Sequence, residues 1–329
     1  MISILCPTYN EEKYIVKCIE SIISQDYPLE EMELLFIDGG SNDKTREIIA
    51  KYQEEYDFIK LLDNPFKIVP YAMNIGIEHA MGNIIVRIDA HSFFPNNYVS
   101  VLSNNLLKLD VDNVGVICKT DVFHKSTKTL AIREVLSNPL GVGNALFRIG
   151  INKPTDVDTV PFGCYKREVF EKYGLYDVRL VRNQDIELNK RIKRSGGKIR
   201  LIPDTYCVYY ARETWNTIMK NNFQNGKWNI LTVYYTKNID SLSIRHFIPM
   251  FFVLSILFPV IISLFYLPIG LLSVMSLAIY LALIAFFSIQ IAWRKKLNFY
   301  YLFATFIILH ISYGLGSLKG LFDITFRIK

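Results

Sequence analysis

The sequence predicts an α/β domain with a Rossmann-like, mostly parallel sheet and helices on both faces, followed by a C-terminal helical transmembrane region. Between residues 2 and 88, short apolar runs rich in β-forming residues alternate with helical stretches of about 10–15 residues, which is typical of βαβ units. No Asp, Glu, Lys or Arg occurs from Phe247 to Trp293, which indicates helices that cross a membrane.

The elements of the α/β domain follow one another in a regular order. Short apolar runs predict the strands Ile2–Cys6, Glu33–Ile37, Ile59–Leu62 and Ile84–Ile88, and the longer stretches between them predict the helices Glu12–Ser24, Lys44–Tyr56 and Tyr71–Ala80. Strands joined by helices of this length lie parallel, so their carboxyl ends meet at one edge of the sheet.

Composition narrows the class of protein. The chain has 329 residues, of which 51% are hydrophobic and 21% charged, so disorder and collagen-like repeats are excluded. The five cysteines are scattered, odd in number and without a Cys-x-x-Cys pair: Cys6, Cys18, Cys118, Cys164 and Cys207. This pattern predicts neither a zinc site nor a disulfide framework, and it favours reduced thiols in a cytosol-facing protein.

The net charge of +6 belongs almost entirely to the apolar tail. Residues 247–329 hold six Lys or Arg and one acid, which leaves only +1 for residues 1–246. A nucleic-acid binder needs a strong positive field on its globular part, so we expect no nucleic acid as a partner.

The tail predicts two or three membrane crossings. A helix needs about 20 apolar residues to cross the hydrocarbon core. The stretch 247–293 is long enough for two helices joined by a turn at 267–270, and Asn298–Leu318 is a third candidate. The sequence leaves open whether the third segment crosses, re-enters or lies on the surface.

Basic residues set the predicted orientation, because Lys and Arg in short loops favour the cytoplasmic side. With Arg294-Lys295-Lys296 inside, residues 1–246 face the cytoplasm at the inner (cytoplasmic) membrane of the cell, and the protein is multi-pass. Three crossings would place Lys319, Arg327 and Lys329 outside, in conflict with the same rule.

A change of composition near Arg212 sets the predicted domain boundaries. Residues 214–236 mix Trp, Tyr, Phe and Asn with Lys, which suits the headgroup level of a membrane. We therefore predict an α/β domain at 1–212, an interfacial connector at 213–246 and a membrane region at 247–329.

Three polar clusters follow predicted strands, where open α/β sheets bind ligands. They are Pro7-Thr8-Tyr9-Asn10-Glu11-Glu12, Asp38-Gly39-Gly40-Ser41-Asn42-Asp43-Lys44-Thr45 and Asp89-Ala90-His91. Singly, they could be a helix cap, a tight turn and a surface pair. Their coincidence on one sheet favours a binding site. The sequence has no G-x-G-x-x-G and no P-loop motif, so a dinucleotide oxidoreductase and a P-loop enzyme are excluded.

A fourth cluster spans Arg182–Asn189 and opens a helix. Asp185 and Glu187 would either favour the helix dipole or, as a general base, remove a proton from an acceptor hydroxyl. Further on, Lys227-Trp228 would contact either a substrate or lipid headgroups, and the sequence does not separate these alternatives.

Together the clusters resemble the family 2 glycosyltransferases of the GT-A fold. The family's motifs occur in its order over residues 1–235: Pro7-Thr8-Tyr9-Asn10-Glu11, Asp38-Gly39-Gly40-Ser41-Asn42-Asp43, Asn74-Ile75-Gly76, Asp89-Ala90-His91 and Asn183-Gln184-Asp185. The Asp-Ala-His variant, the segments 157–160, 182–189 and 225–228, and the apolar spans most resemble membrane-anchored exopolysaccharide glucosyltransferases of the succinoglycan type.

The resemblance implies roles residue by residue. Thr8, Tyr9 and Glu11 would line the nucleoside pocket, and Asp38 would bond the uracil of a UDP-sugar. Asp43 and Asn74 would border the nucleotide and its diphosphate. Asp89 would face the ribose or a divalent metal, Mn²⁺ or Mg²⁺, and His91 would be a metal ligand. Asp185 would be the catalytic base, with Glu187, Lys227 and Trp228 as contacts to the acceptor or the diphosphate.

The sequence departs from the family pattern at two places. The usual third motif is Asp-x-Asp, but its last position is His91 here, and Mn²⁺ tolerates imidazole better than Mg²⁺ does. The Gln-x-x-Arg-Trp motif of polysaccharide synthases is matched except that Lys227 stands in place of its Arg. Lysine lacks the bidentate fork of arginine. The tail is also too short for a translocation channel.

These features lead to one main functional hypothesis and two alternatives. The main hypothesis is an inverting transferase that moves a hexose, taken to be glucose, from a UDP-sugar to a lipid-linked saccharide at the membrane, in company with other polysaccharide-assembly proteins. The first alternative is transfer to polyprenyl phosphate. The second is a catalytically silent nucleotide-sugar-binding subunit.

Overall fold

The structure is a computed structural model that describes residues 1–326 and contains two compact units. Unit 1 consists of Met1–Lys119 and Leu146–Tyr210, and unit 2 consists of Thr120–Ala145 and the chain from Ala211 on. A boundary thus falls close to residue 212, and the segment 120–145 also belongs to unit 2. The last three residues of the predicted membrane region, including Arg327 and Lys329, lie outside the described residues.

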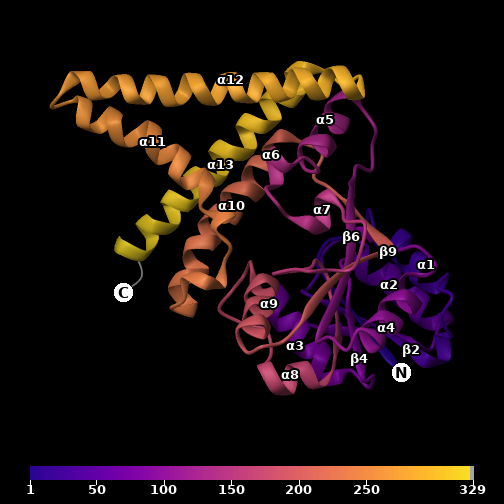
Figure 1. Ribbon diagram of the computed structural model, residues 1–329. Helices are drawn as coiled ribbons and strands as arrows, with labels where there is room; N and C mark the ends of the chain where they lie inside the picture. The colour runs from indigo at the N-terminus through magenta and orange to yellow at the C-terminus, as the bar shows by residue number, and fades with distance from the viewer. Residues whose placement is uncertain (327–329) are drawn as a thin grey trace. The chain divides into compact units, whose positions relative to one another are not determined.

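The first four strands of unit 1 lie parallel, as predicted. Figure 1 labels two of them, β2 and β4. They are β1 (Ile2–Thr8), β2 (Met32–Asp38), β3 (Ile59–Asp63) and β4 (Ile84–Arg87), and they alternate with α1 (Ile15–Ile23), α2 (Thr45–Glu55) and α3 (Val69–His79). β1 pairs with β2 and β4, and β2 pairs with β3. The fold class is confirmed, and each predicted boundary lies within three residues of the observed one.

The rest of the sheet makes it mixed. In the described chain the strand order is β3-β2-β1-β4-β8-β6-β9-β5, with β7 paired to β9. β8 lies antiparallel to both β4 and β6. β6 therefore runs in the direction of β4, and β8 is inserted between them from much later in the chain. The remaining elements of unit 1 are η1 (Leu29–Glu31), β5 (Ser92–Phe93), α4 (Tyr98–Lys108), β6 (Asn113–Asp121), α7 (Leu146–Ile149), β7 (Thr155–Asp156), β8 (Cys164–Lys166), α8 (Glu168–Tyr173), α9 (Gln184–Arg194) and β9 (Ile199–Tyr210).

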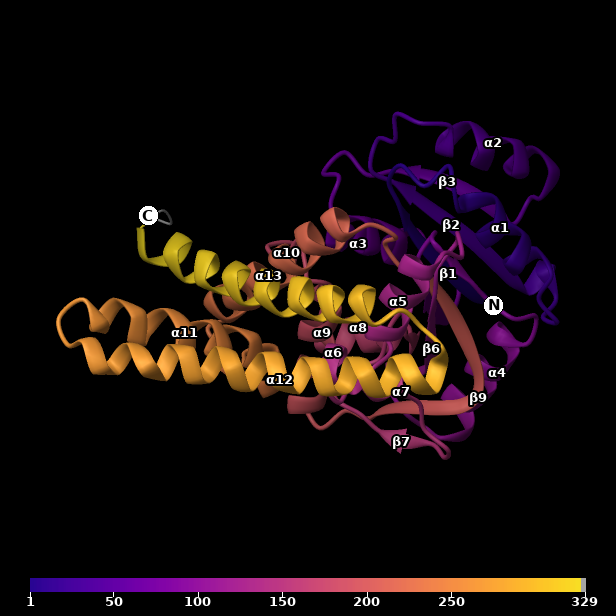
Figure 2. The same cartoon turned by 90° about the horizontal axis from the view of Figure 1, so that it is seen from above.

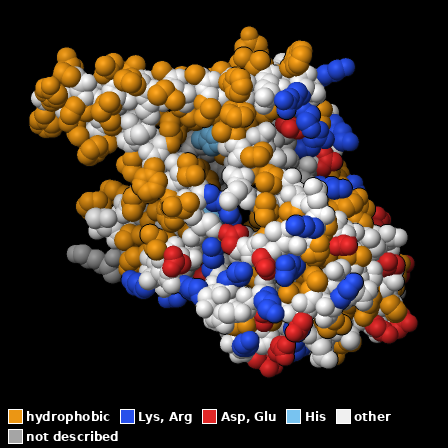
Figure 3. All heavy atoms as spheres, viewed as in Figure 1, with side chains coloured by type: hydrophobic (Ala, Val, Ile, Leu, Met, Phe, Trp, Pro, Cys, Tyr) orange, Lys and Arg blue, Asp and Glu red, His pale blue; other side chains and the backbone are white. Residues whose placement is uncertain are grey.

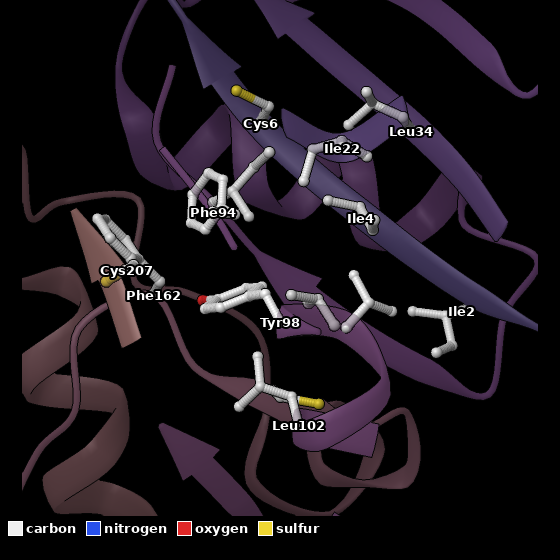
Figure 4. Packing of buried hydrophobic residues seen from close by; sticks show 14 of the residues in the cluster. Ile2, Ile4, Cys6, Ile22, Leu34, Phe94, Tyr98, Leu102, Phe162 and Cys207 are labelled. Carbon is white, nitrogen blue, oxygen red and sulfur yellow. The ribbon is translucent and has the colours of Figure 1, made fainter. Parts of the chain in front are cut away.

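Alternate residues of β1 enter two different cores, because successive side chains of a strand point to opposite faces. Ile4 and Cys6 join the core that contains Ile22 of α1 and Tyr98 of α4 (Figure 4). Leu5 joins the second core, on the face covered by α3, α8 and α9. Helices thus cover both faces of the sheet, as predicted.

Unit 2 is helical. Its elements are α5 (Thr127–Val135), α6 (Pro139–Val142), α10 (Trp215–Thr236), η2 (Ile239–Ser241), η3 (Ile244–His246), α11 (Ile248–Ser263), η4 (Leu267–Ile269), α12 (Gly270–Lys295) and α13 (Phe299–Phe326). Figure 2 shows α11 and α12 joined at one end by a short connection.

The segment 120–145 joins unit 2 because its apolar residues pack against α12 and α13. Ala131 and Val135 of α5 are buried in one cluster with Ile291 and Phe306. His310 Nε2 also lies 2.9 Å from the carbonyl oxygen of Leu140. Such packing of distant segments has no signal in the local sequence pattern.

Of the helices in residues 1–326, two are long and apolar enough to cross a membrane. They span Leu267–Lys295, with a mean hydropathy of 2.4, and Phe299–Phe326, with a mean hydropathy of 1.5. The third apolar helix, α11, is shorter, and the predicted turn at 267–270 separates it from α12.

Helices α10 and α13 approach each other closely through glycines. A Cβ atom on Gly226 would lie 1.9 Å from the carbonyl oxygen of Tyr313, and one on Gly316 would lie 1.9 Å from that of Phe223. No side chain fits at either position, which is the packing that small residues permit between membrane helices.

We expect Gly316→Ala to destabilise unit 2. The added methyl overlaps backbone, so the helices must separate, and overpacking of this kind costs about 1–3 kcal/mol. Thermal unfolding in detergent measures the effect. Gly270→Ala is the matched control, because its Cβ would meet only the Ser263 side chain, at 3.1 Å. An unchanged melting temperature in Gly316→Ala would contradict the close packing of α10 and α13.

Candidate active site

The first two polar clusters follow β1 and β2, whose carboxyl ends lie side by side in unit 1. The Asn10 amide donates to Ser41 Oγ at 2.8 Å. The Glu11 amide donates to Thr45 Oγ1 at 2.8 Å, and the Asn42 amide donates to Asn10 Oδ1 at 2.9 Å. Because each loop bonds the other, the two clusters form one continuous rim.

Asp38, the last residue of β2, holds its own loop. Its Oδ1 accepts hydrogen bonds from the amides of Gly40 and Ser41 at 3.0 and 2.9 Å. Arg46 Nη1 lies 2.9 Å from the same oxygen. The Asp38 side chain is 0% exposed. A carboxylate buried and bonded in this way supports the loop from inside.

Asp43 accepts a hydrogen bond across the rim from the Glu12 amide at 3.2 Å and a local one from the Thr45 amide at 3.0 Å. Desolvation acts to raise the pKa of Asp43, but the hydrogen bonds from Thr45 and Glu12 outweigh it and lower the pKa. Asp43 therefore stays ionised at the edge of the site.

Thr8 and Tyr9 differ in their exposure. Thr8 is buried, and its hydroxyl donates to the Cys6 carbonyl oxygen at 2.9 Å. The Tyr9 ring is exposed, and a Cβ atom added to Gly39 would lie 3.5 Å from its Cδ2. Of these two side chains, that of Tyr9 is the one exposed to solvent.

A contact between Glu11 and His91 joins the first cluster to the third. His91 Nδ1 lies 2.9 Å from Glu11 Oε1. The rings of Tyr14 and Tyr209 flank the imidazole edge-on, with centroids 6.3 and 5.0 Å away. These contacts fix the orientation of His91.

Arg87 joins the third cluster to the fourth. Its Nη2 lies 3.3 Å from Asp89 Oδ1, and its Nη1 lies 3.7 Å from Asp185 Oδ2. The Arg87 side chain is 7% exposed, whereas those of Asp89 and Asp185 are 22% and 30% exposed. The guanidinium thus lies beneath two carboxylates that solvent can reach. Burial acts to lower the pKa of Arg87, but the charges of Asp89 and Asp185 raise it above its ordinary value.

The position of Asp185 is set by α9. The helix begins after Asn183, which has a left-handed backbone with φ of 62° that Asn tolerates. Asn189 is fully buried: it accepts from Asn113 Nδ2 at 2.8 Å and donates to Thr159 Oγ1 at 2.9 Å. These bonds anchor the helix that carries Asp185.

Two further predicted site residues, Glu187 and Asn74, have partners within unit 1. Glu187 is buried and forms a two-pronged ion pair with Arg191, whose Nε lies 3.1 Å from Oε1 and whose Nη2 lies 2.5 Å from Oε2. The implied acceptor contact therefore has no exposed carboxylate at Glu187. The Asn74 amide donates to the Tyr176 carbonyl oxygen at 2.9 Å and accepts from the Tyr176 amide at 3.0 Å, so it holds that loop.

Lys227 and Trp228 lie in α10 of unit 2. Lys227 Nζ is 2.8 Å from Asp323 Oδ2 of α13. The Trp228 ring stacks on Tyr235 with a centroid distance of 6.4 Å. Both side chains have partners within unit 2.

Asp89 and His91, which follow β4, could supply part of the ligand set of a divalent cation. Among residues 1–326, no group of three His, Cys, Asp or Glu side chains could hold a metal ion. Asp89 offers a solvent-reachable carboxylate and His91 an imidazole, so the protein would supply two ligands. Such a pair fits a cation whose other ligands are phosphate oxygens and water, as Mg²⁺ sites commonly have.

A model of the family described as glycosyl transferase family 2 matches residues 3–174. The match covers more than half of the chain, and the first three polar clusters follow strands within the matched residues. The chain belongs to this family, and it is a glycosyltransferase.

Two relatives illustrate the similarity. A Methanococcus voltae protein, dolichyl N-acetyl-alpha-D-glucosaminyl phosphate 3-beta-D-2,3-diacetamido-2,3-dideoxy-beta-D-glucuronosyltransferase, is 29% identical over 68% of this chain and 71% of its own. The succinoglycan biosynthesis protein ExoA of Rhizobium meliloti is 31% identical over 64% of this chain and 63% of its own.

Solved structures share the GT-A fold. The mannosyltransferase PcManGT of Pyrobaculum calidifontis, in complex with GDP-Man and Mn²⁺, is 16% identical with a TM-score of 0.64 and covers 98% of this chain and 87% of its own. S. aureus TarS 1-349, in complex with UDP-GlcNAc, is 14% identical with a TM-score of 0.53 and covers 97% of this chain and 91% of its own.

Sequence reasoning missed Arg87. Its signal was present, because a charged residue ends an otherwise apolar strand and shares with Ile85 the face that packs into the core. The strand pattern alone did not predict that Arg87 would contact Asp89 and Asp185.

Proposed function

We propose that this glycosyltransferase moves a hexose, specifically glucose, from a UDP-sugar to a lipid-linked saccharide during the synthesis of a cell-surface polysaccharide. The observation that carries the proposal is the pair of carboxylates at Asp89 and Asp185, which one guanidinium links at the strand ends of unit 1. Asp89 would serve the donor, and Asp185 would serve the acceptor.

Asp185 would act as the general base. Its carboxylate is partly exposed, and the Ile186 amide donates to its Oδ1 at 2.9 Å, which leaves Oδ2 for a proton. As the acceptor oxygen attacks the anomeric carbon, its proton passes to Asp185 and the bond to the UDP oxygen breaks. A single displacement inverts the configuration, so an α-linked donor gives a β-glycoside.

The rim formed by the first two clusters would bind the nucleotide. Tyr9 would contact the nucleoside, and Glu11 and Asp43 would border it. Three residues would support the loops of the nucleotide site without contacting the nucleotide, because each is bonded to other atoms of unit 1: Thr8, Asp38 and Asn74.

We propose a divalent metal held by Asp89 and His91. When bound, it would neutralise the negative charge that develops on the diphosphate leaving group. The Glu11 carboxylate beside His91 would orient the imidazole, as carboxylates commonly do for ligating histidines.

We expect EDTA to abolish transfer and Mn²⁺ to restore it better than Mg²⁺, because one ligand is an imidazole. His91→Asp should shift the preference toward Mg²⁺, since it replaces nitrogen with oxygen. Initial rates across a series of each metal measure the ratio. Full activity in EDTA would contradict the metal, and an unchanged Mn²⁺ to Mg²⁺ ratio in His91→Asp would contradict the role of His91.

The acceptor is proposed from chemistry and from the relatives. The Methanococcus voltae name describes a sugar on dolichyl phosphate, and the Rhizobium meliloti name describes polysaccharide biosynthesis. An acceptor anchored in lipid also agrees with the two apolar helices of unit 2. Other polysaccharide-assembly proteins would supply and remove this lipid.

We propose that α11 and α12 cross the cytoplasmic membrane, one outward and one back, so that unit 1 and the C-terminal end of α12 both lie on the cytoplasmic side. Exposed apolar residues cover much of α12 in Figure 3, and basic residues gather at its C-terminal end. These are Arg294, Lys295 and Lys296, which follow Trp293 in the chain. A basic and aromatic end of this kind suits cytoplasmic headgroups.

Mass spectrometry of the lipid product tests the proposed acceptor. The proposal predicts a lipid-linked saccharide that is one hexose larger than the acceptor supplied. A single sugar on a polyprenyl monophosphate would replace this acceptor with the carrier lipid. UDP-sugar binding without any product would indicate a silent subunit.

A further inference from the structure

Arg87 is a buried charge in a position that the fold would otherwise fill with an apolar residue. It ends β4, pairs in register with Leu5 and lies on the face of Ile85, both of which belong to the core beneath α3 and α9. Burying an ion pair is often no more stabilising than well-packed apolar residues. Stability alone therefore does not explain an arginine at this place.

The guanidinium is also incompletely satisfied. Within residues 1–326, Arg87 Nε and Nη1 have no hydrogen-bond partner. The charged groups that face Arg87 are Asp89, from the same strand end, and Asp185, from α9. Tyr165 and Tyr176 are its other titratable neighbours. Arg87 thus lies against two carboxylates while its Nε and Nη1 donate no hydrogen bond, which is expected of a group placed for function.

We infer that Arg87 is a positioning residue, which holds the Asp185 carboxylate in a fixed place relative to Asp89 on the donor side of the site. The inference rests on the proposed function. Nη2 donates to Asp89 Oδ1 at 3.3 Å, and Nη1 forms an ion pair with Asp185 Oδ2 at 3.7 Å without a hydrogen bond, so one planar guanidinium sets the separation of the two carboxylates. Without it, two like charges at one site repel each other, and Asp185 loses its alignment with the acceptor hydroxyl.

Lysine cannot take this role, although it keeps the charge. It offers one ammonium on a flexible stem and can serve one carboxylate at a time, whereas the arginine fork serves both. A misplacement of about 1 Å at a reacting group can cost about a hundredfold in rate. We therefore expect Arg87→Lys to lower kcat about 10- to 100-fold and to raise the donor KM much less.

The experiment is a double-mutant cycle with Asp185. Arg87→Lys and Arg87→Met are made in the wild-type full-length chain and in Asp185→Asn, and transfer from a radiolabelled UDP-sugar is measured in nanodiscs. If Arg87 acts through Asp185, neither Arg87 substitution lowers the residual rate of Asp185→Asn more than about twofold, since residues that act as a unit are non-additive.

Arg167→Lys is the matched control. Arg167 donates to main-chain carbonyl oxygens, including those of Gly82 and Ile77 at 3.4 Å, and no described carboxylate contacts its guanidinium. Its effect should be the same in both backgrounds. Equal losses of kcat from Arg87→Lys in both backgrounds would overturn the inference. So would full activity of Arg87→Lys in the wild-type chain. Full activity of Asp185→Asn would instead overturn the proposed function.

Discussion

Asp185→Asn is expected to lower kcat for sugar transfer about a thousandfold while the affinity for UDP stays within about twofold. General-base catalysis contributes about 10²–10⁴ in rate, and the amide keeps the size of the side chain but accepts no proton. Because Asp185 would act on the acceptor, nucleotide binding at the rim should be little affected. Transfer from a radiolabelled donor and equilibrium binding of UDP measure the two quantities separately.

The control for this prediction makes the same chemical change elsewhere. Asp204 is an exposed residue of β9 in the same unit, and Asp204→Asn should leave both kcat and UDP affinity unchanged. A retained kcat in Asp185→Asn would show that another group takes the proton. A loss of UDP affinity equal to the loss of kcat would place Asp185 in nucleotide binding instead.

Asp38→Ala is expected to lower the free energy of unfolding by about 2–3 kcal/mol. The change removes the acceptor for two loop amides and the buried partner of Arg46. Affinity for UDP should fall as well, since the loop that Asp38 holds is bonded to the Asn10 loop. Thermal unfolding and UDP binding of the purified protein check both effects.

Asp63 provides a matched control, because it contacts the same arginine from the surface. Arg46 Nη1 lies 2.8 Å from Asp63 Oδ1, but the Asp63 side chain is 79% exposed, whereas that of Asp38 is 0% exposed. Exposed ion pairs contribute about 0–1 kcal/mol, so Asp63→Ala should have a small effect. Similar melting temperatures for the two variants would contradict the support role of Asp38.

The fold was predictable where the relevant pattern is local. Alternation of short apolar runs with helical stretches identified β1 to β4 and α1 to α3, since each βαβ unit is contiguous in the chain. β8 was not predictable in this way, because it enters between β4 and β6 from about 80 residues beyond β4. The packing of Ala131 and Val135 against α12 and α13 is a long-range contact of the same kind.

The candidate site shows the same limit. The motifs identified which loops meet, and contacts such as Glu11 with His91 agree with that expectation. Residue type alone did not separate a carboxylate that faces solvent, as at Asp185, from one that holds a helix, as at Glu187. The two residues are only two positions apart, so the helix turns their side chains in different directions.

The most direct test of the account is transfer of radiolabel from a panel of UDP-sugars to membrane lipid by the purified protein in nanodiscs. The account predicts metal-dependent labelling of a lipid-linked saccharide from one donor, UDP-glucose, and almost none in Asp185→Asn. Tight binding of UDP with no labelled lipid from any donor, under conditions in which the protein is folded, would contradict it.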